Sequence, residues 1–170
     1  MGLKDLFGLG GKKEEPVRER TPFTLISGDM IDYEGTSYFV TVKYTLEENG
    51  WRWYEYRLDD GAGHELWFTA EDDDGVVNTT IYTPVKAPEL EPGADRLSFQ
   101  GKEYVLEESG TATGTMETKQ DHRSGLQCRY WDYVTEDETE YLSLEKWNDT
   151  LEVSTGKPVN EFEYELYPGG

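Results

Sequence analysis

The sequence predicts an all-β protein in which antiparallel meanders form two similar halves of a sandwich or a partly closed barrel. Runs of β-branched and aromatic residues recur along the chain, a strong hairpin signal joins two of them, and no long segment has helical periodicity. Although the mean hydropathy is -0.78, aromatic residues make up 14% of the chain, which argues against disorder. We therefore expect mostly strands and less than about 10% helix.

The first half of the chain is predicted to be a three-stranded meander. Asn49-Gly50 is its strongest turn signal, because both central positions of a two-residue hairpin turn need a positive φ. A second turn is expected at residues 59–63, and the acidic run 72–75 ends the third strand. The predicted strands are residues 38–46, 51–58 and 66–71.

Residues 76–95 are expected to separate the two halves. The prolines Pro84, Pro88 and Pro92 cannot donate a hydrogen bond to a sheet. We therefore predict one short strand around Ile81-Tyr82, followed by an irregular connector that divides the domain in two.

The second half repeats the alternation of strands and turns. Residues 111–125, which are rich in Gly and Thr, are interpreted as a flexible polar insert within it. Its last two segments alternate apolar and polar residues with period two, as half-buried strands do. The predicted strands are a pair within residues 96–106, then residues 126–135, 141–147, 150–154 and 161–166.

Three short strings of the first half recur in the second half in the same order. Such self-similarity predicts two alike meanders that pack face to face or close on one another. We expect a single domain over residues 22–170, with halves at about 22–83 and 95–170. The matched strings are residues 35–40 with 101–106, 54–56 with 131–133, and 68–71 with 142–145.

Residues 1–21 are expected to be a flexible leader outside this domain. Leu3, Leu6 and Phe7 have helical spacing, but a single helical turn is marginal in water. The affinity of so short an amphipathic segment for a membrane would be weak. A weak peripheral membrane contact through residues 1–11 therefore stays open beside a frayed tail.

The charge of the chain excludes one class of partner. Sixteen basic and 36 acidic residues give a net charge of -20, a field that repels phosphate backbones, so we expect no nucleic-acid partner. Three explanations of this negative charge stay open: solubility, adaptation to a high-salt cytoplasm, and a surface that attracts cations. Cys128 is the single cysteine and there is no run of about 20 apolar residues. We expect a cytoplasmic protein, with the inner face of the membrane as an open alternative.

Four stretches of the chain carry a family resemblance: residues 28–35, 53–58, 66–72 and 167–169. They read Gly-Asp-Met-Ile-Asp-Tyr-Glu-Gly, Trp-Tyr-Glu-Tyr-Arg-Leu, Leu-Trp-Phe-Thr-Ala-Glu-Asp and Tyr-Pro-Gly. In this order they resemble the prokaryotic family known as domain of unknown function 4178. The resemblance implies a β-rich, non-membrane domain, often encoded near membrane-stress and polyamine-related proteins, with no established catalytic residues. Its signature residues in this sequence are Trp53, Glu55, Tyr56, Trp67 and Glu71.

Carboxyl and aromatic side chains make up the candidate site. Alternation along the strand places Trp53 and Glu55 on one face and Tyr56 on the other. The recurring strings pair Glu55 with Asp132 and Glu71 with Glu145, so four carboxyl groups are expected at equivalent places. Solvated strand positions, a cation site and a general acid–base pair are all compatible with them. The predicted ligand or partner surface comprises Trp53, Glu55, Tyr56, Trp67, Glu71, Asp132 and Glu145.

The motifs that would indicate a reaction are missing from the sequence. The two histidines lack zinc-ligand spacing, and Ala70 stands where an EF-hand loop with Gly75 as its central glycine needs its first ligand. We therefore assign no catalytic residue, metal ligand or cofactor. The preferred interpretation is a non-enzymatic binding or scaffolding module of a prokaryotic cytoplasmic protein, with a protein partner. A carboxylate-based hydrolase or lyase and a glycan- or cation-binding module are the alternatives, and the oligomeric state is left open.

Overall fold

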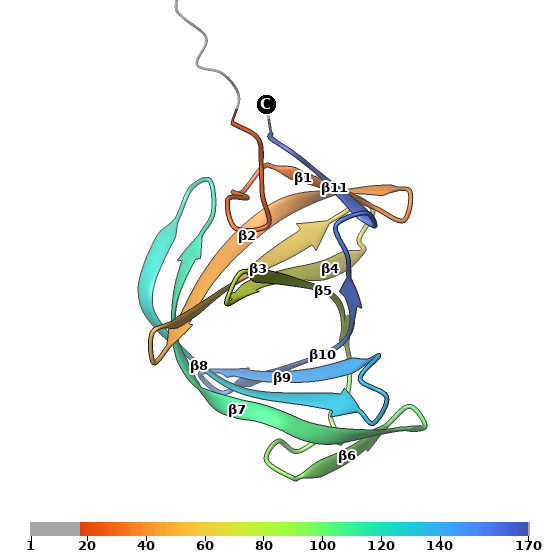
Figure 1. The fold of residues 1–170 in the computed structure, drawn as a ribbon. Coiled ribbons are helices and arrows are strands. Elements are labelled where there is room, and N and C mark those ends of the chain that lie inside the picture. The colour runs from red at the N-terminus through yellow and green to blue at the C-terminus, as the bar shows by residue number, and fades with distance from the viewer. Residues whose placement is uncertain (1–17, 170) are drawn as a thin grey trace, which may run out of the picture.

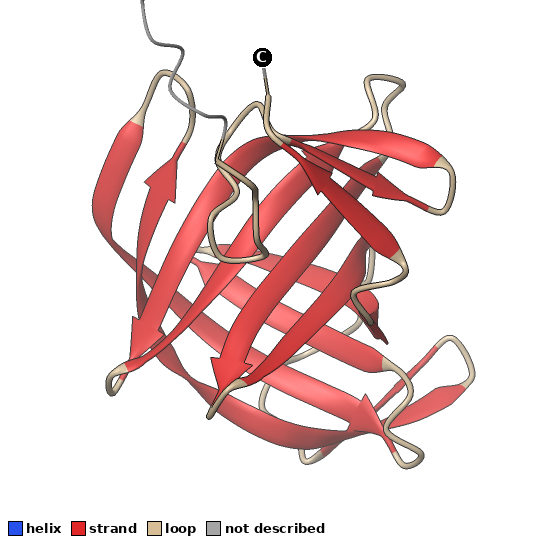
Figure 2. Ribbon diagram, turned by 45° about the horizontal axis from the view of Figure 1, so that its top comes forward, coloured by secondary structure: helices blue, strands red, loops and turns tan. Residues whose placement is uncertain are grey.

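The protein is built from antiparallel strands. The computed structural model describes residues 18–169, and within that range eleven strands are present and no helix that could cross a membrane is found. Figure 2 shows strands joined by loops throughout, which confirms the predicted all-β class. The strands are β1 (Met30–Tyr33), β2 (Thr36–Glu48), β3 (Trp51–Asp59), β4 (Glu65–Asp73), β5 (Val76–Val85), β6 (Arg96–Phe99), β7 (Lys102–Glu117), β8 (His122–Thr135), β9 (Tyr141–Trp147), β10 (Thr150–Val159) and β11 (Tyr164–Tyr167).

Eight of the strands form a ring. They follow one another in the order β2-β3-β4-β5-β10-β9-β8-β7, and β7 pairs back to β2 between residues 113–117 and 43–47 (Figure 1). This closing pairing covers only part of each strand, so the ring is a partly closed barrel. The remaining strands lie outside it: β1 and β11 pair with each other beside β2, and β6 pairs with β7.

The two halves of the ring begin in the same way. A short strand, β1 or β6, enters a tight turn and continues into a long strand, β2 or β7. The turns at Glu34-Gly35 and Gln100-Gly101 have the same φ values, 49° followed by 77°. The predicted Asn49-Gly50 turn is confirmed, with φ values of 50° and 84°. Strand β1 was not predicted, although the Glu34-Gly35 turn marks its end.

Two sequence-based boundaries were wrong. Strand β5 spans ten residues instead of a short piece around Ile81, because Thr and Val residues continue its β-favouring run on both sides. Residues 111–125 are also not a polar insert, since most of them belong to the long β7–β8 hairpin. An added Cβ at Gly110 would overlap the carboxylate of Glu48 from β2, so this glycine allows close approach of the two strands.

The apolar cores lie on the outside of the ring. Each covers one half of it, where burial of a large apolar side chain contributes about 1.5–3 kcal/mol. The first outer core is covered by β1, β11 and the segment before β1, and consists of Leu25, Ile31, Tyr33, Val40, Tyr56, Leu58, Phe68, Ile81, Val159 and Tyr164. The second outer core includes residues of β6 and of the connector after β5, and consists of Ala87, Leu90, Phe99, Tyr104, Trp131, Tyr133, Leu142, Leu144 and Val153.

A third apolar cluster lies inside the ring. Leu46, Ala112, Cys128 and Tyr130 are buried there, and Trp53 and Trp147 pack against them. These residues come from β2, β7, β8, β3 and β9, the strands around the closing β2–β7 pairing. They fill one part of the interior of the ring, and the remaining part is open space.

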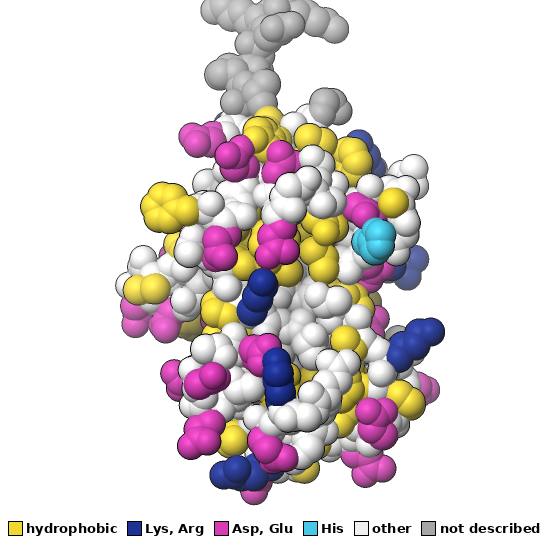
Figure 3. Space-filling model, turned by 90° about the vertical axis from the view of Figure 1, so that its right-hand side faces the viewer, with side chains coloured by type: hydrophobic (Ala, Val, Ile, Leu, Met, Phe, Trp, Pro, Cys, Tyr) yellow, Lys and Arg dark blue, Asp and Glu magenta, His cyan; other side chains and the backbone are white. Residues whose placement is uncertain are grey.

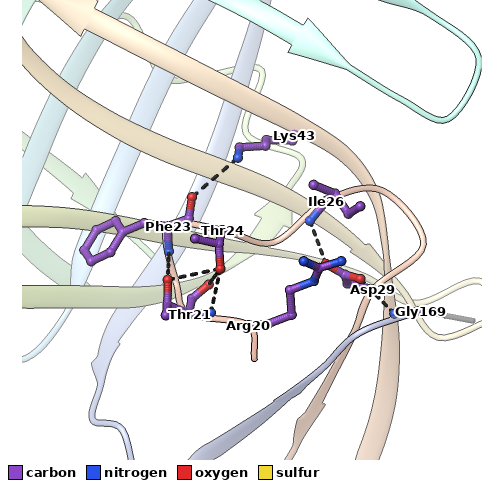
Figure 4. Close-up of polar contacts among 8 residues, drawn as sticks. All are labelled: Arg20, Thr21, Phe23, Thr24, Ile26, Asp29, Lys43 and Gly169. Atoms are coloured by element: carbon purple, nitrogen blue, oxygen red, sulfur yellow. Dashed lines mark hydrogen bonds and ion pairs between the residues drawn. The ribbon is translucent and has the colours of Figure 1, made fainter. Parts of the chain in front are cut away.

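Asp29 joins the segment before β1 to the C-terminal segment on the outer side of the fold. Its carboxylate forms an ion pair with Arg20 at 2.7 Å and accepts hydrogen bonds from the backbone N–H groups of Ile26 and Gly169, each at 2.8 Å (Figure 4). Two family-signature strings, which begin at Gly28 and end at Gly169, therefore meet here. Residues 1–17 of the expected leader lie outside the described residues, and Arg20 contacts the fold.

Candidate functional site

The ring encloses a cavity of about 970 Å³, and residues of all eight ring strands line it. This is within the volume range of small-molecule sites. The lining reaches the strand ends at Asn49, Asp73 and Asn160, which mark its mouth. The period-two alternation of the strands explains the lining: each strand presents one set of side chains to an outer core and the other set to the cavity.

Six of the seven predicted site residues line this cavity: Trp53, Glu55, Trp67, Glu71, Asp132 and Glu145. They come from β3, β4, β8 and β9, so the fold brings together residues up to 92 positions apart in the sequence. Tyr56 does not belong to this surface. It is fully buried in the first outer core, because it follows Glu55 directly and points to the opposite side of β3.

Two carboxyl groups meet inside the cavity, that of the buried Glu55 and that of the half-buried Glu145. Glu55 and Glu145 are hydrogen-bonded to each other, and each also accepts a hydrogen bond from an indole N–H: Trp53 to Glu55 and Trp147 to Glu145, both at 3.1 Å. A hydrogen bond between two carboxyl groups requires that one of them keep its proton. Burial raises the pKa of both groups, and their mutual repulsion raises that of Glu145 further.

Asp132 and Glu152 extend the acidic surface of the cavity. Burial raises the pKa of Asp132 to about 7, and the neighbouring Glu145 adds to the shift, whereas a hydrogen bond from Ser143 opposes it. Burial also raises the pKa of Glu152, and Arg57 opposes that rise. Glu152 was missed in the sequence, although its alternation with Leu151 and Val153 placed it on the face opposite to an apolar core.

Further carboxyl groups lie nearer to the mouth. Glu71 accepts a hydrogen bond from the indole N–H of Trp51 at 3.3 Å, and burial raises the pKa of Glu71. Glu48 accepts hydrogen bonds from the Tyr130 hydroxyl and from the backbone N–H of Thr111, so it links β2 to β7 and β8. The carboxyl groups that line the cavity are Glu48, Glu55, Glu71, Asp73, Glu107, Glu108, Asp132, Glu145, Glu152 and Glu163.

Aromatic rings form another part of the site, close to the Glu55–Glu145 pair. Tyr44 is the cross-strand neighbour of Glu55. Its ring centroid lies 5.8 Å from that of Trp67 and 5.2 Å from that of Trp147, with the rings tilted by about 45° to each other. We call these three residues the aromatic corner. Trp67 is the member of the corner that lines the cavity, so the corner offers aromatic surface next to the pair.

The cavity lining carries no lysine, arginine or histidine in the described part of the chain. Arg57 on β3 acts on Glu152 of the lining, but its guanidinium is 2.5 Å from the Glu65 carboxylate. Within residues 18–169 no group of three or more His, Cys, Asp or Glu side chains is arranged to hold a metal ion. The outer surface in Figure 3 is also acidic, with more Asp and Glu side chains than Lys and Arg.

Fold and site together define a partly closed antiparallel barrel with an acidic cavity that aromatic residues flank. The chain belongs to the family described as Domain of unknown function (DUF4178), whose model matches residues 27–161. This confirms the resemblance read from the sequence motifs. The matched range contains Glu55, Asp132 and Glu145 together with all eight ring strands. Comparison with curated proteins and with solved structures gave no match.

Proposed function

We propose that this protein is a non-enzymatic binding module whose cavity holds a small organic cation. The observation that carries the proposal is the composition of the cavity wall: ten carboxyl groups and no basic side chain. Small ligands are recognised by a few polar groups that converge in a concave site. Here the convergent groups are carboxyls, which recognise positive charge.

The aromatic corner favours an organic cation as the ligand. Trp67 lines the cavity and packs on Tyr44, which in turn packs on Trp147, so the corner offers apolar aromatic surface that suits the alkyl part of an alkylammonium group. An eight-stranded barrel is wide enough to hold one small ligand. The net charge of -20 would in addition raise the local concentration of cations and speed their entry.

Several expectations from the sequence stay part of this proposal. They are a protein partner, a cytoplasmic location that includes the inner face of the membrane, and a link to membrane-stress or polyamine-related systems. Polyamines are organic cations, so the last of these agrees with the chemistry of the cavity. A scaffolding role is compatible with the same fold, because the cavity leaves the outer surface free for a protein.

Thermal or chemical unfolding in the presence of matched compounds tests the proposal. Butylammonium chloride and spermidine should stabilise the protein, by about 2.7 kcal/mol when the ligand is at 100 times its Kd. Butanol should not, because it lacks charge, and sodium chloride at the ionic strength of the ammonium salts should stabilise less, because it acts by screening alone. Equal stabilisation by sodium chloride and by the ammonium compounds would show screening alone and would contradict the proposal. Calcium chloride at the same ionic strength tests an inorganic cation site.

A carboxylate-based hydrolase is the second candidate, and one observation favours it. Asp132 has its pKa raised to about 7 next to Glu145, as a general acid would need. If the protein hydrolyses chromogenic glycosides or esters, the Asp132→Asn variant should lose that activity while it keeps its affinity for butylammonium within a few-fold. A wild-type protein without turnover on such a panel leaves the binding module as the account of the cavity.

A further inference from the structure

The Glu55–Glu145 pair has an unusual set of partners. Both carboxyl groups lie in the cavity wall, Glu55 buried and Glu145 half-buried, and an indole N–H fixes an oxygen of each: Trp53 for Glu55 and Trp147 for Glu145. The two groups bond to each other and not to a basic residue. A buried carboxylate is normally paired with a cation, and in this pair a shared proton takes that place.

The strands around the pair supply further ionisable groups but little positive charge. From β2, β5, β8 and β10 the groups that act on the pair or sense its charge are Tyr44, Tyr82, Cys128, Asp132 and Glu152. None of them is cationic, and the guanidinium of Arg57 on β3 is bound to Glu65. The site therefore has an excess of negative charge, which the neutral form of the pair reduces.

We propose that the Glu55–Glu145 pair is the seat of the ligand's ammonium group, and that binding there displaces the proton that the two carboxyl groups share. This inference rests on the proposed function, since it requires that a cation enter the cavity. An ammonium group brings three N–H donors, which replace the single O–H donor between the carboxyls. The carboxyl group that releases its proton to solvent becomes a carboxylate, so two carboxylates face one ammonium ion.

The aromatic corner lies at the same location and suits the alkyl part of the ligand. Tyr44 is paired with Glu55 across β2 and β3, and Trp147 donates its indole N–H to Glu145. The rings of Tyr44 and Trp147, whose centroids are 5.2 Å apart, therefore pack beside the pair. Trp67, the third ring of the corner, lines the cavity, and its apolar surface suits an alkyl chain better than the water shell of a hydrated metal ion.

Proton displacement makes the affinity depend on pH. Burial raises the pKa of Glu55 and of Glu145 in the free protein, and a bound cation would lower it again. The free protein thus carries the proton below the raised pKa and the complex does not. Affinity should increase with pH, up to tenfold per pH unit, until the pair is ionised in the free protein.

Isothermal titration calorimetry with butylammonium chloride tests this inference. Titrations at the same pH in buffers of different ionisation enthalpy, such as phosphate and Tris, give the number of protons released on binding. We expect close to one proton per ligand at the acidic end of the pH range in which the protein stays folded, where the pair is protonated, and fewer as the pH is raised. Binding without proton release would overturn the inference and leave the proposed function intact, whereas no binding at all would contradict both.

Variants locate the source of the proton. Glu145→Gln should bind butylammonium at least tenfold more weakly and release no proton, because the amide of Gln keeps the hydrogen bond to Glu55 but cannot ionise. Glu71→Gln, which changes a carboxyl group nearer to the mouth, should still release the proton. Asp132→Asn should release it too, although the pKa of Asp132 is about 7. Loss of proton release in Asp132→Asn, with release retained in Glu145→Gln, would assign the proton to Asp132 and contradict the inference.

Discussion

The inner and outer faces of the ring differ more than the two halves of the chain do. Glu55 and Tyr56 are adjacent in the sequence, yet one faces an acidic cavity and the other is fully buried in an apolar core. The same contrast separates Asp132 from Tyr133 in the second half. Each strand therefore serves the cavity with alternate residues and stabilises the fold with the rest.

This difference teaches how the protein keeps a hollow interior. A small barrel usually fills its interior with side chains. Here much of the apolar burial is moved outward, where β1, β11, β6 and the connector after β5 cover the ring. The interior is then free to hold carboxyl groups, although their burial without cations lowers stability near neutral pH.

The largest expected effect comes from removing a large side chain from an outer core. Phe68 is fully buried and packs its ring 5.0 Å from that of Tyr164. Phe68→Ala should lower the free energy of unfolding by about 3–5 kcal/mol, because it leaves a cavity in a packed core. The neighbouring inner residue Thr69 is the control, and Thr69→Ala should lower it by less than about 1 kcal/mol. Urea unfolding measures both, and equal losses would break the distinction between the two faces.

An intermediate effect is expected from Asp132 and should depend on pH. Its pKa of about 7 lies above the 3.8 of an unfolded aspartate, so the folded state binds the proton more tightly. The stabilisation that this proton gives is complete at pH values below the unfolded pKa of 3.8, and it is lost as the pH rises through the folded pKa of about 7. Between about pH 5 and pH 8 the wild-type protein should therefore lose roughly 2 kcal/mol more of its free energy of unfolding than Asp132→Asn does, after allowance for solvent in the cavity. An unchanged pH profile would contradict this environment for Asp132.

The smallest expected effect distinguishes two tyrosines at matching positions of the halves. The Tyr133 hydroxyl donates to the carbonyl of Ala94 at 2.9 Å and accepts from the N–H of Gly93 at 3.2 Å. The Tyr56 hydroxyl is buried without a hydrogen-bond partner. Tyr133→Phe should lower the free energy of unfolding by about 1 kcal/mol, whereas Tyr56→Phe should leave it equal or higher. A loss in Tyr56→Phe as large as that in Tyr133→Phe would show that its hydroxyl has a partner after all.

Sequence reasoning predicted the fold class because alternation and turn signals are local. Asn49-Gly50 and the β-branched runs act through neighbouring residues, so their prediction was confirmed. Sequence reasoning missed the extent of β5 and of the β7–β8 hairpin, because pairing with distant strands decides where these strands begin and end. Alternation also separated Glu55 from Tyr56, but only the closure of the ring shows which face is the interior.

The candidate site could be predicted in part for the same reason. The recurring strings suggested that four carboxyl groups occupy equivalent places, and the structure puts all four around one cavity. Nothing in the sequence indicated that Glu55 would touch Glu145 or that Trp147 would join them. Those contacts depend on the pairing of β5 with β10 and of β2 with β7, which are long-range pairings that local patterns do not encode.

The indole N–H signals of the five tryptophans test the central claim most directly. In a nitrogen-15 spectrum recorded during titration with butylammonium chloride, the signals of Trp53 and Trp147 should move together and saturate, because their N–H groups donate to Glu55 and Glu145. The signal of Trp131 should stay in place, since this residue lies in the second outer core. Shifts confined to Trp51 at the mouth, or a shift of Trp131 equal to those of Trp53 and Trp147, would contradict a cation site inside the ring.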